Sequence, residues 1–195
     1  MKKFLSAAIS LCLALFIVLG LCSCGYSNEI VPCENIVKAI TDSEIGLPAG
    51  KIYSASAGEG ESGYIPDSLL NSLFGGGGKI SLFDSWIDYS FFMPSSAHPC
   101  EIVVILCDSP ENAKDTARLL CRRLNTIKSV KGDGNRATPF GITEAQNGAQ
   151  QNDESSPDYS AYLDGAEVTI SRNYVLLIIS SDTAAAKKTA LALIG

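Results

Sequence analysis

Four cysteines in the body of the chain have the side chains best suited to covalent chemistry: Cys33, Cys100, Cys107 and Cys121. A catalytic thiol needs a neighbour that lowers its pKa, and the single histidine, His98, lies two positions before Cys100. Neighbours at a loop and a strand start rarely form a catalytic dyad. Lengths of about 3.3 Å per strand residue and about 1.5 Å per helix residue place Cys121 nearer to Cys100 than to Cys107, which is compatible with a Cys100–Cys121 disulfide. The alternative is buried free thiols.

Carboxylates flank the only tryptophan. Asp84, Trp86 and Asp88 alternate along an apolar stretch, so a strand places all three on one face. If helices cover the other face, Trp86 is exposed between two carboxylates and marks a contact surface. The alternative is that the region 51–81 covers Trp86. Asp84, Asp88 and Glu101 are also the carboxylates that a small hydrolase or transferase could use if the fold brings them together.

Three stretches match ligand-binding motifs only in part. Four glycines, 75–78, precede Lys79, but Ile80 stands where a phosphate loop needs serine or threonine. The stretch 60–63 has its second glycine one residue too early for a nucleophile elbow. A calcium-loop spacing in the second half of the chain has Thr138 where glycine is required. With one histidine in the chain, the sequence predicts no metal and no cofactor.

The N-terminal region has the organisation of an export signal. Lys2 and Lys3 precede an apolar run that extends from Phe4 to Leu21. The run ends in Leu-Cys-Ser-Cys-Gly, which resembles the lipobox of bacterial lipoproteins and implies that Cys24 is acylated on sulfur and begins the mature chain. Each buried acyl methylene contributes about 0.8 kcal/mol, so two or three chains anchor a small domain. The alternatives are a retained transmembrane helix and ordinary signal-peptidase cleavage.

Length and composition indicate one domain with short appendages. The chain has 195 residues, of which 46% are hydrophobic and 18% are charged. The formal charge of −6 provides no counterion-release drive toward nucleic acid, so nucleic-acid binding is not expected. We divide the chain into a signal peptide at 1–23, a lipidated tether at 24–33 and a domain at 34–195. The polar stretch 130–158 is expected to be a flexible insertion.

Two runs of strand, strand and helix are predicted. Their expected ranges are strands 84–93 and 101–107 with a helix capped by Ser109, and strands 166–171 and 174–180 with a helix over 182–194. A shift of 73 residues aligns the second run with the first without a gap. This similarity is either a duplication or two similar solutions to one packing problem. Shorter predicted elements are helices over 35–43 and 66–75 and a strand over 51–56.

These elements predict an α+β fold. Two hairpins that each bury one face under their own helix combine into an antiparallel sheet of about four strands. The expected architecture is therefore two-layer, with the helices packed on one face of the sheet. At this size about 70% of the extended-chain surface is buried, so the domain needs neither a metal nor a disulfide.

Several of these patterns occur together in one family. They are the short helix before the glycine turn, the strand that reaches Tyr89, the Pro99-Cys100-Glu101-Ile102 sequence, the helix that reaches Arg122 and Arg123, and the closing Asn173-Tyr174-Val175. With them, residues 63–124 and the last hairpin resemble a family of uncharacterised lipoproteins of Gram-positive bacteria, known only as a domain of unknown function. The stretch 130–158 looks like an insertion relative to that pattern. The resemblance implies an anchored extracytoplasmic domain and brings no activity with it.

The sequence thus leads to an expectation about role as well as location. We expect a lipoprotein on the outer face of the cytoplasmic membrane, held there through Cys24, that is not an enzyme and binds a protein, peptide or envelope component. One alternative is a small carboxylate-dependent envelope hydrolase or transferase. Another is a purely structural partner in a lipoprotein complex. No motif names the ligand, the partner or the oligomeric state.

Overall fold

A computed structural model describes residues 30–43, 45–75, 81–96, 98–130 and 159–195. All its helices and strands lie in one compact unit, Val31–Ile194. Cys24, the predicted signal peptide and nearly all of the predicted insertion 130–158 lie outside the described residues. Among the residues described, no helix is both long and apolar enough to cross a membrane.

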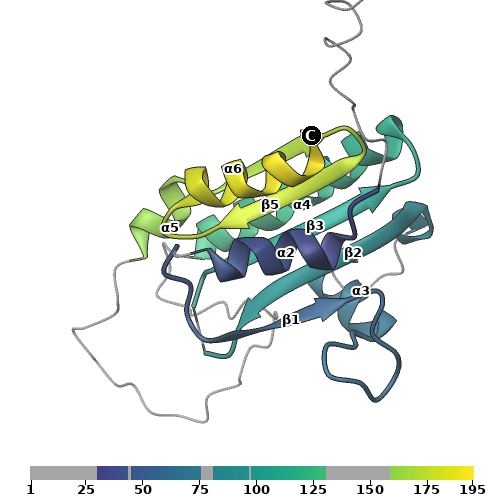
Figure 1. The fold of residues 1–195 in the computed structure, drawn as a ribbon, viewed down its shortest axis with the longest axis horizontal. Helices are drawn as coiled ribbons and strands as arrows, with labels where there is room; N and C mark the ends of the chain where they lie inside the picture. Colours follow the sequence, from purple (N-terminus) through teal and green to yellow (C-terminus); the bar gives the residue numbers. More distant parts are fainter. Residues whose placement is uncertain (1–29, 44, 76–80, 97, 131–158) are drawn as a thin grey trace, which may run out of the picture. The chain divides into compact units, whose positions relative to one another are not determined.

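The centre of the fold is a five-stranded antiparallel sheet (Figure 1). Its strands, in spatial order, are β1 (Gly50–Ser54), β2 (Trp86–Pro94), β3 (Glu101–Cys107), β5 (Tyr174–Ile179) and β4 (Glu167–Ser171). The predicted α+β class with an antiparallel sheet is confirmed. The strand count is five rather than four because β1 pairs with the outer edge of β2, with Ile52 opposite Phe92.

Helices cover both faces of this sheet, which corrects the expectation of helices on one face only. On one face lie α2 (Cys33–Asp42) and α6 (Thr183–Ile194). The opposite face is covered by α3 (Asp67–Gly75), the short 3-10 helix η1 (Ser81–Ser85), α4 (Pro110–Val130) and the short helix α5 (Ser160–Asp164). The architecture therefore has three layers, with the sheet in the middle (Figure 1).

The composition of the central strands explains the third layer. Every residue of β3 and β5 is buried. Their side chains alternate between two cores, so that Val103 and Ile105 face α4 while Ile102 and Val104 face α2 and α6. A strand that is apolar on both faces needs cover on both faces. The apolar run of β3 was recognised in the sequence, and its consequence for the layer count is visible only in the structure.

The two strand-strand-helix runs are not copies of one three-dimensional unit. The shift matches β2 with β4 and β3 with β5. Because β3 and β5 are antiparallel neighbours, the rotation that superposes these pairs has its axis perpendicular to the sheet and does not exchange the two faces of the sheet. That rotation would place α4 and α6 on one face. They pack on opposite faces, so the similarity at a shift of 73 residues reflects two similar solutions to one packing problem.

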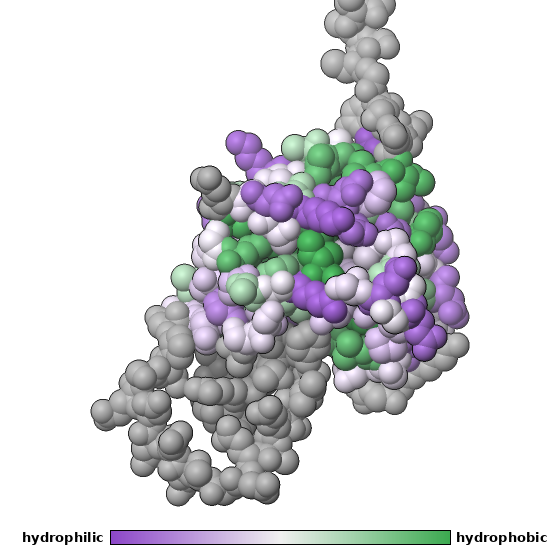
Figure 2. Space-filling model, turned by 60° about the horizontal axis from the view of Figure 1, so that its bottom comes forward, coloured by the Kyte–Doolittle hydropathy of each residue, from purple (hydrophilic) through white to green (hydrophobic). Residues whose placement is uncertain are grey.

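The surface mixes polar and apolar side chains. Figure 2 shows hydrophilic and hydrophobic residues interspersed over one face of the molecule. Among the described residues, the large apolar side chains that are exposed come from four separate segments: Ile30, Ile87, Ile170 and Leu193. Exposed apolar residues of this kind are ordinary on a soluble surface and do not by themselves define an interface.

Candidate functional site

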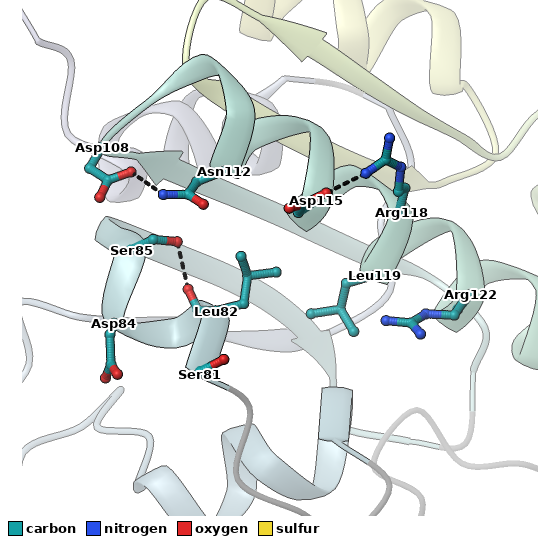
Figure 3. A pocket seen from close by; sticks show the side chains of 10 residues that line it. All are labelled: Ser81, Leu82, Asp84, Ser85, Asp108, Asn112, Asp115, Arg118, Leu119 and Arg122. Atoms are coloured by element: carbon teal, nitrogen blue, oxygen red, sulfur yellow. Dashed lines mark hydrogen bonds and ion pairs between the residues drawn. The ribbon is translucent and has the colours of Figure 1, made fainter.

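The described part of the chain contains a groove between η1 and α4, with a volume of about 820 Å³ (Figure 3). Four lining residues come from η1 and the others from the start and outer face of α4: Ser81, Leu82, Asp84, Ser85, Asp108, Asn112, Asp115, Arg118, Leu119 and Arg122. Eight of the ten lining side chains are polar or charged, and the two apolar ones are Leu82 and Leu119.

Local hydrogen bonds hold the two walls of the groove together at one end. The Asp108 N–H donates to the Ser85 carbonyl over 3.0 Å, which joins the end of η1 to the start of α4. Ser109 caps α4, as predicted, because its Oγ accepts the Asn112 N–H at 3.2 Å. The Ser85 hydroxyl donates to the Leu82 carbonyl at 2.6 Å and closes the turn of η1.

The charged side chains of the groove are divided between its ends. In Figure 3, Asp84 and Asp108 lie at one end and Arg122 lies at the other. Asp108 accepts a hydrogen bond from Asn112 Nδ2 at 2.7 Å, and the Asp115–Arg118 pair is bonded internally.

Within the described ranges, two of the lining charges have neither an ion pair nor a side-chain hydrogen bond. Among the residues that the structure describes, neither Asp84 nor Arg122 has an ion-pair partner. Within this part of the chain Asp108 also lacks an ion-pair partner, but it accepts the Asn112 hydrogen bond. The Asp84 and Arg122 side chains, in contrast, make no hydrogen bond or ion pair among the described residues and lie at opposite ends of the groove.

Trp86 does not form the exposed contact surface expected from the alternation. Only 9% of its surface is exposed, and its ring packs against Phe74 of α3 and Phe83 of η1, with ring centroids 5.7 and 4.6 Å away. The Trp86 indole N–H donates to the Thr116 hydroxyl of α4 at 3.0 Å. The alternative prediction is that the region 51–81 covers Trp86, and Phe74 of this region does so.

A bulge explains the change of face. The pairing of β2 with β3 shifts register between Trp86 and Asp88. The extra residue, Ile87, is 58% exposed, and Trp86 lies on the same side of the sheet as Tyr89, 6.0 Å away. A bulge moves every side chain on one side of it to the opposite face relative to strict alternation.

Asp88 has a structural partner on the α2 face. Its Oδ2 accepts the backbone N–H of Cys33, the first residue of α2, at 2.7 Å. The first N–H groups of a helix lack partners within the helix, and a carboxylate there also interacts favourably with the helix dipole. Asp88 thus contacts α2 on one face of the sheet, whereas Asp84 lines the groove at η1 and α4 on the other face, so the two carboxylates do not form a pair.

Glu101 is also engaged in a structural contact. Its side chain is fully buried, and its two carboxylate oxygens each accept a hydrogen bond from Arg123 at 2.6 Å. Arg123 donates in addition to the Leu73 carbonyl in the last turn of α3, at 2.9 Å. This pair ties β3, α3 and α4 together. Of the three carboxylates of the hydrolase alternative, the structure brings only Asp84 to the groove.

The Cys100–Cys121 disulfide is not formed, and the prediction of this pairing is wrong. Cys100 is buried in the core beneath α2 and α6, whereas Cys121 is exposed on α4, across the sheet. The lengths of the strand and the helix predict that Cys100 and Cys121 lie at a similar level along the strand direction. These lengths carry no information about the face of the sheet on which each residue lies. Cys33 and Cys107 are buried free thiols, as the alternative proposed.

Burial makes three of these thiols poor nucleophiles. It is the main cause that raises the pKa of the Cys33 thiol, and the Asp88 carboxylate adds to the effect. Burial, with a smaller contribution from Glu101, raises the pKa of Cys100 to about 12, and burial also raises the pKa of Cys107. A pKa of about 12 instead of 9.0 reduces the thiolate fraction near pH 8 about a thousandfold.

We therefore expect N-ethylmaleimide to modify Cys121 rapidly in the native protein and to spare Cys33, Cys100 and Cys107 until denaturant is added. Peptide mapping by mass spectrometry identifies which of the four is modified. The variant Cys121→Ser is the control, and it should remove the rapid reaction among these four. Rapid native labelling of Cys100 would contradict the structure, because its thiol has no exposed surface.

His98 lies in the connection from β2 to β3 and contacts the segment that contains α5. Its ring is 4.9 Å from Tyr159 and 4.7 Å from Tyr162, and its Nδ1 accepts the Cys100 N–H at 3.1 Å. Only an unprotonated Nδ1 can accept this hydrogen bond. Burial lowers the pKa of His98 below 6.5.

The folded state should consequently lose stability as the pH falls below about 6.5, because the unfolded chain then binds a proton that folded His98 resists. The stability that depends on neutral His98 is fully present above pH 6.5, and it is lost as the pH falls through the lower pKa of His98 in the folded state. Urea unfolding at pH 7.5 and pH 5.5 measures it, with His98→Gln as the matched variant. Since this is the only histidine, an equal pH dependence in both proteins would contradict the assignment.

The groove residues on α4 could in part have been found from the sequence. Asp108, Asn112, Asp115 and Arg122 are separated by intervals of mostly three or four, which places them along one side of a helix. Of the partner wall, η1, only Asp84 and Ser85 fall in the strand predicted over 84–93. In the described ranges, no three histidine, cysteine, aspartate or glutamate side chains come together in a way that could hold a metal ion.

Comparisons of the chain with family models, curated proteins and solved structures found no match. The resemblance to lipoproteins of unknown function stays a prediction.

Proposed function

We propose that this protein is a lipid-anchored extracytoplasmic binding module that takes its ligand in the groove between η1 and α4. The observation that carries the proposal is the pair of available opposite charges, Asp84 and Arg122, at the two ends of a cleft of about 820 Å³. Exposed charges at the rim of a cleft steer and orient a ligand more than they add affinity.

The contacts of Asp88 and Glu101 argue against a catalytic set made of Asp84, Asp88 and Glu101. Asp88 caps α2 and Glu101 is paired with Arg123, so each stabilises the fold. General acid–base work by two carboxylates requires that both reach one substrate. Only Asp84 of the three lines the groove, so the three carboxylates named in the hydrolase alternative do not meet at one site.

Replacing the proposed lipidation residue tests the anchor. We expect Cys24→Ser to abolish palmitate labelling and to leave the precursor unprocessed, because serine has no thiol to form the thioether. Globomycin should cause the same accumulation of precursor in the unmodified protein. Membrane fractionation and palmitate incorporation unaffected by Cys24→Ser would overturn the anchor.

Site-specific photocrosslinking in intact cells tests the groove. A benzophenone amino acid at Ser81, inside the groove, should give an ultraviolet-dependent adduct that Arg122→Gln weakens. The same amino acid at Lys188, exposed on α6, is the matched control and should not give that adduct. Identical adducts from both positions, or an adduct that is insensitive to Arg122→Gln, would overturn the groove as the binding site.

A further inference from the structure

We infer that the ligand of the groove is a short extended peptide with a free amino group and a free carboxylate, an inference that rests on the proposed binding function. The amine would bind at Asp84 and the carboxylate at Arg122. These two residues lie at opposite ends of the groove, and each has no ion-pair partner among the residues that the structure describes.

The other charges of the groove argue for a ligand with both signs. A polyanion such as a nucleotide would meet Asp84 and Asp108 at one end. A polycation would meet Arg122 at the other end, where Arg118 is already paired with Asp115. Like charges facing one another across an interface are a strong source of rejection. A molecule with a positive and a negative terminus avoids both repulsions.

The length of the groove fits a peptide of about five residues. The groove runs along α4 from its start at Pro110 to Arg122, which is 122 − 110 = 12 positions and spans about 18 Å at about 1.5 Å per residue. An extended peptide rises about 3.3 Å per residue. Five residues cover about 16 Å, which is close to this length.

Two leucines lie in the middle of the groove, beside Asn112 and Asp115 of α4. Leu82 of η1 and Leu119 of α4 point toward each other between the charged ends (Figure 3). Leu119 is almost fully buried and Leu82 is half-buried, so both leave an apolar floor under the centre of a bound chain. An extended peptide presents alternate side chains to one surface, which places its third residue over this floor. A leucine there is the complementary choice.

Calorimetric titration of the purified full-length chain in detergent tests the inference with the pentapeptide Ala-Ala-Leu-Ala-Ala. Acetylating its amine or amidating its carboxylate should each weaken binding about fivefold at low salt, the scale of an exposed ion pair. Asp84→Asn should lose sensitivity to acetylation alone, and Arg122→Gln should lose sensitivity to amidation alone. Asp42→Asn and Lys188→Gln, exposed charges on α2 and α6, are the matched controls and should keep both sensitivities.

The outcomes separate this inference from the proposed function. If acetylating or amidating the peptide weakens binding equally in all variants, Asp84 and Arg122 do not recognise the two termini, and the inference is overturned. If no pentapeptide binds while the Ser81 crosslink stays dependent on Arg122, the peptide class is wrong and the binding module stands. If the peptide does not bind and the Ser81 adduct is also absent, both are overturned.

Discussion

Replacing Arg123 by alanine is expected to lower the free energy of unfolding by about 3–5 kcal/mol. The change leaves the fully buried Glu101 carboxylate without either of its two hydrogen bonds at 2.6 Å. It also removes the bond to the Leu73 carbonyl, which holds the end of α3 against α4. A buried charge without a partner keeps its desolvation cost and loses the compensating attraction. Urea or thermal unfolding followed by circular dichroism measures the loss.

The chain offers a matched control on the same helix. Arg118 is paired with Asp115 at the surface, with 75% and 53% of the two side chains exposed. Arg118→Ala should therefore change the free energy of unfolding by no more than about 0.5 kcal/mol. Replacing Glu101 and Arg123 together by methionine and leucine should recover most of the loss, since apolar side chains of similar volume carry no desolvation cost. A loss below about 1 kcal/mol for Arg123→Ala would contradict the role of the pair.

The variant Trp86→Ala is expected to destabilise the fold by about 3–5 kcal/mol, the range for removing a large buried aromatic side chain. The indole fills the space between Phe74, Phe83 and Tyr89 and donates to Thr116. Trp86→Phe keeps much of the packing but leaves the Thr116 hydroxyl without this donor, so a loss of about 1–2 kcal/mol is expected. Chemical denaturation of the three proteins measures the series.

Ile87 is the control for this series because it is the next residue in the strand and its side chain is 58% exposed. Ile87→Ala should shift the unfolding free energy by less than about 0.5 kcal/mol. If the bulge were absent, as strict alternation predicts, the order would reverse and the isoleucine would be the costly residue. Equal, small losses for Trp86→Ala and Ile87→Ala would contradict the observed placement of both side chains.

The strands and helices of the fold could largely be predicted from local pattern. The apolar run of β3, the Ser109 cap of α4 and the two-residue turn at Arg172-Asn173 each depend on neighbours in the chain. Hydrophobic periodicity and capping are short-range properties, so the sequence alone expresses them. The lipobox-like sequence around Cys24 is also a local pattern, and its acylation stays a proposal.

The faces to which side chains turn could not be predicted in the same way. One extra residue at Ile87 moves Trp86 from the expected contact surface into the core, and nothing in the alternation of 84–93 marks that residue as the bulge. Cys100 and Cys121 match in height along the sheet, yet the sheet lies between them. Both errors concern which side of the sheet a residue occupies, and this depends on register and packing between distant segments.

The sequence by itself determined the α+β class, the order of most elements and the presence of buried thiols, because these follow from local propensity and from the apolar content of each segment. Tertiary structure decided the rest. It placed helices on both faces, assigned Asp88 and Glu101 to stabilising contacts, and set Asp84 of η1 opposite Arg122 of α4. A site built from two elements exists only once the packing of the whole chain has fixed the space between them.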